Sequence, residues 1–114
     1  MITDDMKVAI ENKRSLVKNL NTKLNKIIEV ELDLKTRERN ILNKTNWNEL
    51  FQTTNRVTDK QKTAHIDDLL KKDQEKLARL KNEVVVIKND IQLCNDEISL
   101  CKYIIKEKEL ESSF

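Results

Sequence analysis

The sequence between Leu77 and Ile105 reads LARLKNEVVVIKNDIQLCNDEISLCKYII, and its apolar residues follow a single repeat. They stand alternately three and four residues apart over four heptads. In a helix of 3.6 residues per turn, such steps return to one side. The stretch therefore predicts a long helix with a coiled-coil seam, which we expect to serve in oligomerisation. The seam residues are Leu77, Leu80, Val84, Ile87, Ile91, Cys94, Ile98, Cys101 and Ile105.

The composition favours long helices with narrow apolar faces. None of the 114 residues is Gly or Pro, so the usual means of making tight turns and β-hairpins are missing. Charged residues make up 37% and hydrophobic residues 38% of the chain, a mixture typical of solvated helices. We predict an all-α protein with one domain over residues 1–114, a long antiparallel helical hairpin (coiled coil) that associates into a helical bundle.

Charge and hydropathy bear on partners and location. The net charge of +2 is too small to require a nucleic-acid partner. The longest apolar run, Val84–Ile87, is far shorter than the roughly 20 residues that a membrane-spanning helix needs. Polar residues close to Met1 interrupt any secretion signal. We therefore expect a cytoplasmic protein that does not bind membranes.

A second, looser seam lies in the N-terminal part, where a helix is predicted over about residues 4–42. Its apolar residues also recur at heptad spacing, but Lys13, Glu31 and Glu38 interrupt them. Such interruptions cost stability and can restrict the register of helix pairing. The expected seam residues are Met6, Ile10, Val17, Leu20, Leu24, Ile27, Leu34 and Ile41.

Residues 43–57 form the predicted corner, because they are rich in Asn and Thr, whose side chains compete for backbone hydrogen bonds. Asn46 and Glu49 match a capping pair, which predicts a short helical turn inside the corner. Thr58 and Gln61 match a capping box, so the second long helix is expected over about residues 58–109. The two long helices should fold back on each other.

Both long helices carry more apolar residues than one seam uses. With Leu77 at heptad position a, further apolar residues of the second helix fall at positions c and g. Burying each such side chain is worth about 1.5–3 kcal/mol, so leaving many exposed is unfavourable. We expect self-association as a homodimer or higher oligomer, with two hairpins forming a four-helix bundle of two-fold symmetry. The surplus residues are Leu16, Ile28, Val30, Leu42, Leu69, Val86, Leu93, Leu100 and Ile104.

The sequence offers little for catalysis. Cys94 and Cys101 fall on the seam about 10 Å apart along the helix, too far for a disulfide, and are expected to act as small apolar residues. His65 is the single histidine and stands far from both cysteines in the sequence. Neither a metal site nor a Cys–His pair is therefore expected. We predict a non-enzymatic protein without a cofactor.

Two groups of residues near the corner are candidates for binding. The first group is Trp47, Leu50 and Phe51, which stand at helical spacing and include half of the aromatic residues of the chain. These side chains either close the end of the core or bind an unidentified protein. The basic residues around them are candidates for gripping single-stranded nucleic acid, which is the alternative function, although nearby acids oppose it. These basic candidates are Arg56, Lys60, Lys62, Lys71 and Lys72.

Two resemblances follow from these stretches. Residues 56–64, RVTDKQKTA, lead into a Lys- and Asn-rich heptad helix and resemble small helical accessory proteins of bacteriophages of low-GC Gram-positive bacteria. That resemblance implies a partner-binding role and supplies no catalytic residues. The layout of helix, short middle and helix resembles a beta-type prefoldin subunit in outline. Residues 43–57 lack the strand pattern that this family has in the middle.

Overall fold

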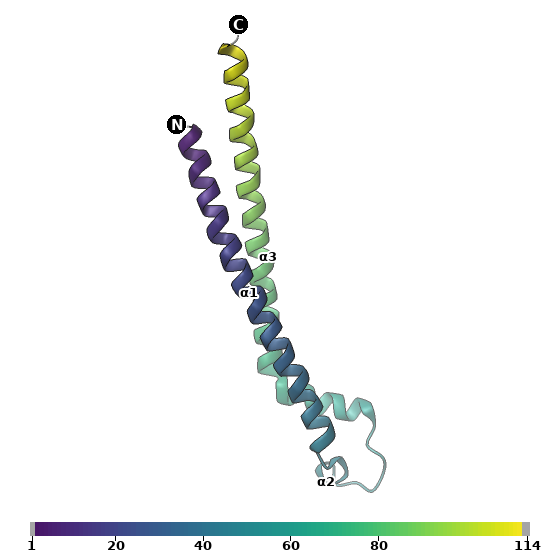
Figure 1. The fold of residues 1–114 in the computed structure, drawn as a ribbon. Helices are drawn as coiled ribbons and strands as arrows, with labels where there is room; N and C mark the ends of the chain where they lie inside the picture. Colours follow the sequence, from purple (N-terminus) through teal and green to yellow (C-terminus); the bar gives the residue numbers. More distant parts are fainter. Residues whose placement is uncertain (1, 113–114) are drawn as a thin grey trace. The chain divides into compact units, whose positions relative to one another are not determined.

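The protein is a helical hairpin. The computed structural model describes residues 2–112, and these residues contain three helices and no strand. The helices are α1 (Ile2–Lys44), α2 (Trp47–Leu50) and α3 (Asp59–Ser112). α1 and α3 run antiparallel, and α2 lies in the connection between them (Figure 1). The predicted all-α helical hairpin is thus confirmed.

α1 and α3 pair within two compact units. The first unit joins residues 2–24 of α1 to residues 82–112 of α3. The second unit, Asn25–Lys81, holds the remaining turns of both helices together with α2 and the corner. Each unit buries apolar side chains of its own, so each has an interface between α1 and α3.

The predicted seam of α3 is the buried side of that helix. Leu80, Val84, Ile87 and Cys101 are buried, and the other five seam residues are half-buried. This side of α3 packs against α1 of the same chain. The apolar surface of α3 that stays exposed, including Val86, Leu93 and Leu100, lies beside this seam.

The predicted seam of α1 is wrong at Val17 and Leu24, which are exposed, whereas Ile10 is half-buried. From Lys13 and from Leu20 the next seam residue can lie three or four residues further on; the prediction took Val17 and Leu24, whereas the half-buried residues are Leu16 and Lys23. Ala9 is 1% exposed, whereas Val17 and Leu24 are 38% and 37% exposed. Buried or half-buried residues recur along α1 at alternate steps of three and four, and Ile2, Ile10 and Glu31 are half-buried beside them. The recurring residues are Met6, Ala9, Lys13, Leu16, Leu20, Lys23, Ile27, Val30, Leu34, Arg37 and Ile41.

Two cations of the α1 seam form ion pairs with α3. In the first unit, the Lys23 Nζ lies 2.9 Å from a carboxylate oxygen of Glu83. In the second unit, Arg37 donates a hydrogen bond to Asp73, and this bond raises the pKa of Arg37 above its ordinary value. Long cationic side chains can lay apolar stems along a seam while their charged ends stay in water. Lys and Arg can therefore occupy seam positions, although a pattern of apolar residues alone does not predict them there.

Both predicted caps are present. The Asn46 side chain accepts a hydrogen bond from the backbone N–H of Glu49 at 3.2 Å and so begins α2. The Thr58 hydroxyl accepts from the backbone N–H of Gln61 at 3.2 Å, and the Gln61 side chain accepts from the backbone N–H of Thr58 at 2.9 Å. This reciprocal pair is a capping box, and it fixes the start of α3.

The corner between α2 and α3 is held by a side-chain amide. Asn48 Nδ2 donates to the carbonyl oxygen of Thr53 at 3.1 Å and to that of Asn55 at 2.9 Å. Gln52 adopts a φ of 51°, in the left-handed region that favours glycine. Hydrogen bonds to Asn48 thus fix the path of a corner that has no glycine.

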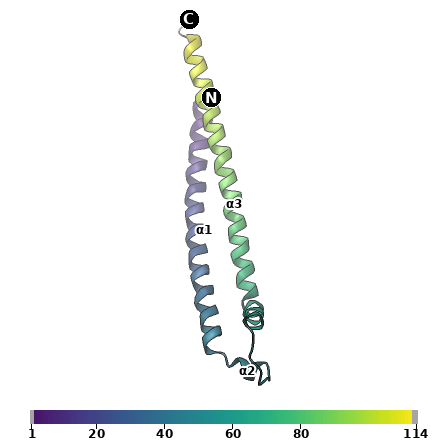
Figure 2. The same ribbon diagram turned by 90° about the vertical axis from the view of Figure 1, so that its right-hand side faces the viewer.

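The core of the second unit lies next to the corner. Trp47 packs there with Val57 and with side chains from both long helices, namely Leu34, Ile66 and Leu70. Leu70 is 1% exposed and is the largest side chain to be fully buried in the described chain. The first turns of α3 turn aside from the rest of that helix and lie near α2 (Figures 1 and 2). This arrangement lets α3 contribute to the core around Trp47.

Candidate protein-binding surface

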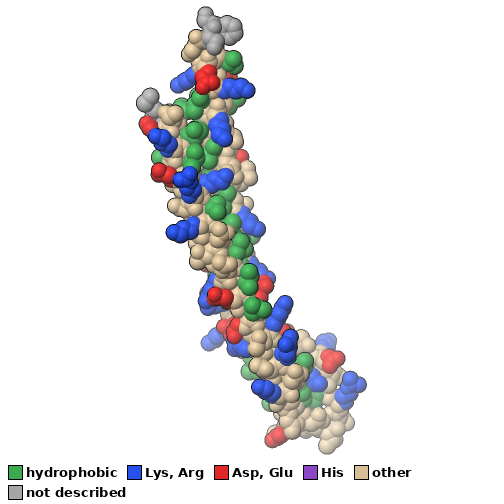
Figure 3. Space-filling model, in the orientation of Figure 1, with side chains coloured by type: hydrophobic (Ala, Val, Ile, Leu, Met, Phe, Trp, Pro, Cys, Tyr) green, Lys and Arg blue, Asp and Glu red, His purple; other side chains and the backbone are tan. Residues whose placement is uncertain are grey.

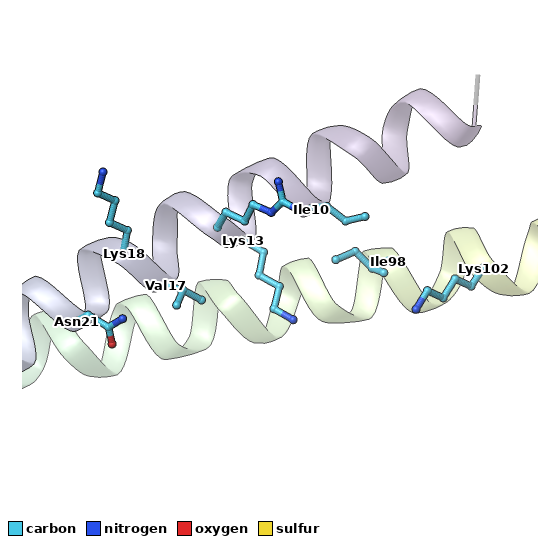
Figure 4. A pocket seen from close by; sticks show the side chains of 8 residues that line it. Ile10, Lys13, Val17, Lys18, Asn21, Ile98 and Lys102 are labelled. Atoms are coloured by element: carbon cyan, nitrogen blue, oxygen red, sulfur yellow. The ribbon is translucent and has the colours of Figure 1, made fainter.

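A groove of about 560 Å³ runs between α1 and α3 in the first unit. Its apolar lining comes from Ile10 and Val17 of α1 and from Ile98 of α3, and Ile10 lies opposite Ile98 (Figure 4). Leu24 continues the α1 side at the same seven-residue interval. Because Val17 and Leu24 lie beside the seam, the pairing of α1 with α3 leaves both of them partly exposed.

Basic side chains border this groove. Lys13 and Arg14 come from α1 and Lys102 from α3, while Lys18 at the edge points away from α3 (Figure 4). No carboxylate lines the groove, and within residues 2–112 none of these four cations forms an ion pair. On the face drawn in Figure 3, Lys and Arg side chains flank hydrophobic ones near the N-terminal end of α1. The name "basic groove" is used below for the surface of Ile10, Lys13, Arg14, Val17, Ile98 and Lys102.

A second surface of the first unit follows α3 beside its seam. Acidic and apolar residues alternate along it at steps of three and four. Val86, Leu93 and Leu100 are 58%, 66% and 58% exposed, so α1 leaves them largely uncovered. The carboxylates between them are also exposed. The name "acidic stripe" is used for Glu83, Val86, Asp90, Leu93, Glu97 and Leu100.

The basic groove and the acidic stripe lie on opposite sides of the helix pair. Val17 lines the basic groove, whereas Asn19 lines a different groove that also contains Glu83 and Val86. Two residues along an α-helix correspond to a rotation of about 200°. One side of the first unit is therefore apolar and basic, and the other is apolar and acidic.

The structure separates the three predicted partner-binding residues. Trp47 is 7% exposed, and its Nε1 donates to the carbonyl oxygen of Leu42 at 3.0 Å. Its ring lies 6.3 Å from that of Phe51 and 5.7 Å from that of His65, measured between centroids. Leu50 and Phe51 remain 46% and 38% exposed. Trp47 thus closes the core, while Leu50 and Phe51 present apolar surface at the corner.

The five predicted nucleic-acid-binding residues are spread over the corner and α3. The Lys62 Nζ lies 5.9 Å from the centroid of the Trp47 ring. Arg56 is exposed at the corner, Lys60 is exposed in the first turn of α3, and Lys71 and Lys72 are exposed further along α3. Because Trp47 is buried, its ring is not open for bases to stack on. The Phe51 ring nearby stays partly exposed.

The cysteines lie on the α3 seam as free thiols, with Cys94 half-buried and Cys101 buried. His65 belongs to the other unit, where it packs on the aromatic rings of the corner. In the part of the chain that the structure describes, no three His, Cys, Asp or Glu side chains are grouped so that they could hold a metal ion. None of the described helices is both long and apolar enough to span a membrane.

Replacing both cysteines by Val is expected to leave the melting temperature nearly unchanged, because Val is of similar size and apolar. Replacing both by Ala should lower stability by a few kcal/mol at most, through small cavities. Thermal unfolding followed by circular dichroism measures both effects. Stoichiometric zinc in the purified protein, or lost assembly with an unchanged melting temperature, would contradict a packing role.

No protein-family model, curated protein or solved structure matches this chain at a significant level. The candidate protein-binding site therefore consists of the basic groove and the acidic stripe of the first unit. The apolar residues of the acidic stripe were predictable from the heptad pattern, but the basic groove was not, because that pattern places Ile10 and Val17 on the α1 seam. The sequence feature that could have predicted the basic groove is the spacing of Ile10, Arg14 and Val17. There a cation stands between two apolar residues, at steps of four and three.

Proposed function

We propose that this chain is a non-enzymatic helical hairpin that assembles with further copies of itself and binds another protein. The observation that carries the proposal is the apolar surface that stays exposed on both sides of the first unit after α1 and α3 have paired. Burying a large apolar side chain is worth about 1.5–3 kcal/mol, and contiguous exposed apolar surface typically marks an interaction site. Contacts between copies would cover this surface without any further component.

The second protein has a separate place to bind. Leu50 and Phe51 are partly exposed at the corner, which belongs to the second unit, so this site uses none of the residues of the first-unit surfaces. The resemblance of residues 56–64 to phage accessory proteins favours a phage-encoded protein that acts in the cytoplasm of a bacterial host. In this proposed role the chain binds proteins and catalyses no reaction.

Light scattering after size-exclusion chromatography is expected to give a mass of at least twice 13.5 kDa at micromolar concentration. The Leu93→Gln/Leu100→Gln variant should dissociate at least about a hundredfold more readily, because two buried apolar side chains would be lost from the contact. Its helix content should match that of the unchanged protein, since both residues lie outside the α1–α3 interface.

Leu110→Gln is the matched control. Leu110 is 54% exposed, close to the values for Leu93 and Leu100, but it lies outside both the basic groove and the acidic stripe. This variant should assemble as the unchanged protein does. A monomer for the unchanged protein at all concentrations up to 100 µM would refute the proposed self-association.

A further inference from the structure

The geometry points to a contact between unlike surfaces, in which the acidic stripe of one copy seats in the basic groove of the next. This inference rests on the proposed self-association and names the surfaces that meet. It departs from the two-fold bundle predicted from the sequence, because in a two-fold contact each copy contributes the same surface.

Charge decides among the possible pairings of the two sides. Two basic grooves placed together would bring Arg14 and Lys102 close to the same cations of the other copy. Two acidic stripes would likewise bring Asp90 and Glu97 together. Juxtaposed like charges disfavour an interface, whereas complementary charges steer and orient it. Of the three pairings, groove against stripe is the one that opposes cations to carboxylates throughout.

The apolar residues of the two surfaces share one period. Each surface repeats at intervals of seven residues, which is about 10 Å along a helix. A helix laid along the groove can therefore keep its apolar residues in step over three successive heptads, as in the packing of coiled coils. The matching sets are Ile10, Val17 and Leu24 on α1, and Val86, Leu93 and Leu100 on α3.

Most of these charges have no partner within their own chain. In residues 2–112, Arg14, Lys102, Asp90 and Glu97 form no ion pair, and Glu83 is the member of the acidic stripe that does. A contact between copies therefore gives these groups opposite charges without breaking existing ion pairs. The Lys23–Glu83 pair stays in place at one end of the stripe.

Unlike surfaces on opposite sides have a consequence for assembly. When one copy seats its acidic stripe in a neighbour's basic groove, its own groove and the neighbour's stripe remain open. Such heterologous contacts build rings if they close and open chains if they do not. Assembly therefore continues beyond a dimer as the concentration rises.

Two charge-reversal variants test the inference in the full-length protein. The groove variant is Arg14→Glu/Lys102→Glu, and the stripe variant is Asp90→Lys/Glu97→Lys. Each variant alone opposes like charges, so its half-assembly concentration should rise by about tenfold or more. An equimolar mixture should recover assembly, because every groove then has a complementary stripe. A chain carrying all four substitutions should also assemble, since both surfaces are reversed together.

The control variant Lys35→Glu/Arg79→Glu makes the same change in net charge as the groove variant, but at exposed residues of the second unit. It should assemble as the unchanged protein does. Circular dichroism checks that each variant keeps its helix content, and the single substitutions Lys102→Glu and Glu97→Lys repeat the test with less disturbance.

The outcomes separate this inference from the proposed function. Assembly of the groove variant or of the stripe variant at the unchanged concentration would overturn the unlike contact while leaving self-association intact. So would a mixture that assembles no better than its components. A monomeric unchanged protein would instead overturn self-association itself.

Discussion

Replacing Trp47 by Ala is expected to lower the melting temperature by at least about 10 °C. Trp47 packs in the core of the second unit with Leu34 and Leu70, and its indole N–H is satisfied by the carbonyl oxygen of Leu42. Truncating a buried aromatic side chain typically costs about 3–5 kcal/mol. Thermal unfolding at a fixed protein concentration measures the effect, because the proposed assembly would make the melting temperature depend on concentration.

Leu50→Ala is the control for this substitution. Leu50 belongs to the same short helix as Trp47 but is 46% exposed, so its truncation removes little buried surface. We expect its melting temperature to stay within a few degrees of that of the unchanged protein. Equal effects of Trp47→Ala and Leu50→Ala would contradict the assignment of Trp47 to the core and of Leu50 to the surface.

Ile27→Ala should destabilise the protein by about 2–5 kcal/mol, whereas Ile28→Ala should have a much smaller effect on folding. The two residues are chemically identical neighbours on α1, but Ile27 is 9% exposed and Ile28 is 54% exposed. The large effect follows from the cavity that the lost side chain leaves between α1 and α3. Urea unfolding of both variants at one concentration measures the difference in the free energy of unfolding.

This pair also tests the register of α1. If α1 were rotated so that the surface at Val17 and Leu24 faced α3, Ile28 would lie closer to the interface. Its truncation to Ala would then also destabilise the fold. Similar unfolding free energies for Ile27→Ala and Ile28→Ala, measured at a concentration too low for self-association, would therefore contradict the observed seam.

The sequence predicted those parts of the fold that local chemistry determines. The seam of α3 has a large apolar residue or a cysteine at every step, so one choice of spacing fits it. The capping pair at Asn46 and the capping box at Thr58 are short-range hydrogen-bond patterns, and both are present in the structure. None of these features needs knowledge of what lies across the interface.

The seam of α1 could not be read in the same way, because its correct choice depends on α3. Ala9 is small enough for close helix packing, and Lys23 and Arg37 are favourable on the seam because Glu83 and Asp73 lie across from them. A sequence pattern that ranks residues by apolar size gives the seam to Ile10 and Leu24 instead. The same error concealed the basic groove, since residues assigned to a seam are not sought on a surface.

The aromatic residues of the corner show a further limit of sequence patterns. Trp47 and Phe51 are four residues apart in the sequence, yet one is buried and the other is partly exposed. Their difference arises from the first turns of α3, whose Ile66 shares the core with Trp47. Such a contact between segments is not encoded in the spacing of the corner residues themselves.

The corner held by Asn48 also determines that the helices of one chain pair before two chains meet. Because a short, hydrogen-bonded connection joins α1 to α3, each helix meets its partner at an effective concentration of the order of millimolar. Copies of the chain meet at the far lower concentration of free protein, so pairing within one chain comes first. The seam is then already occupied when two chains collide, so the proposed self-association would add finished hairpins through their outer sides.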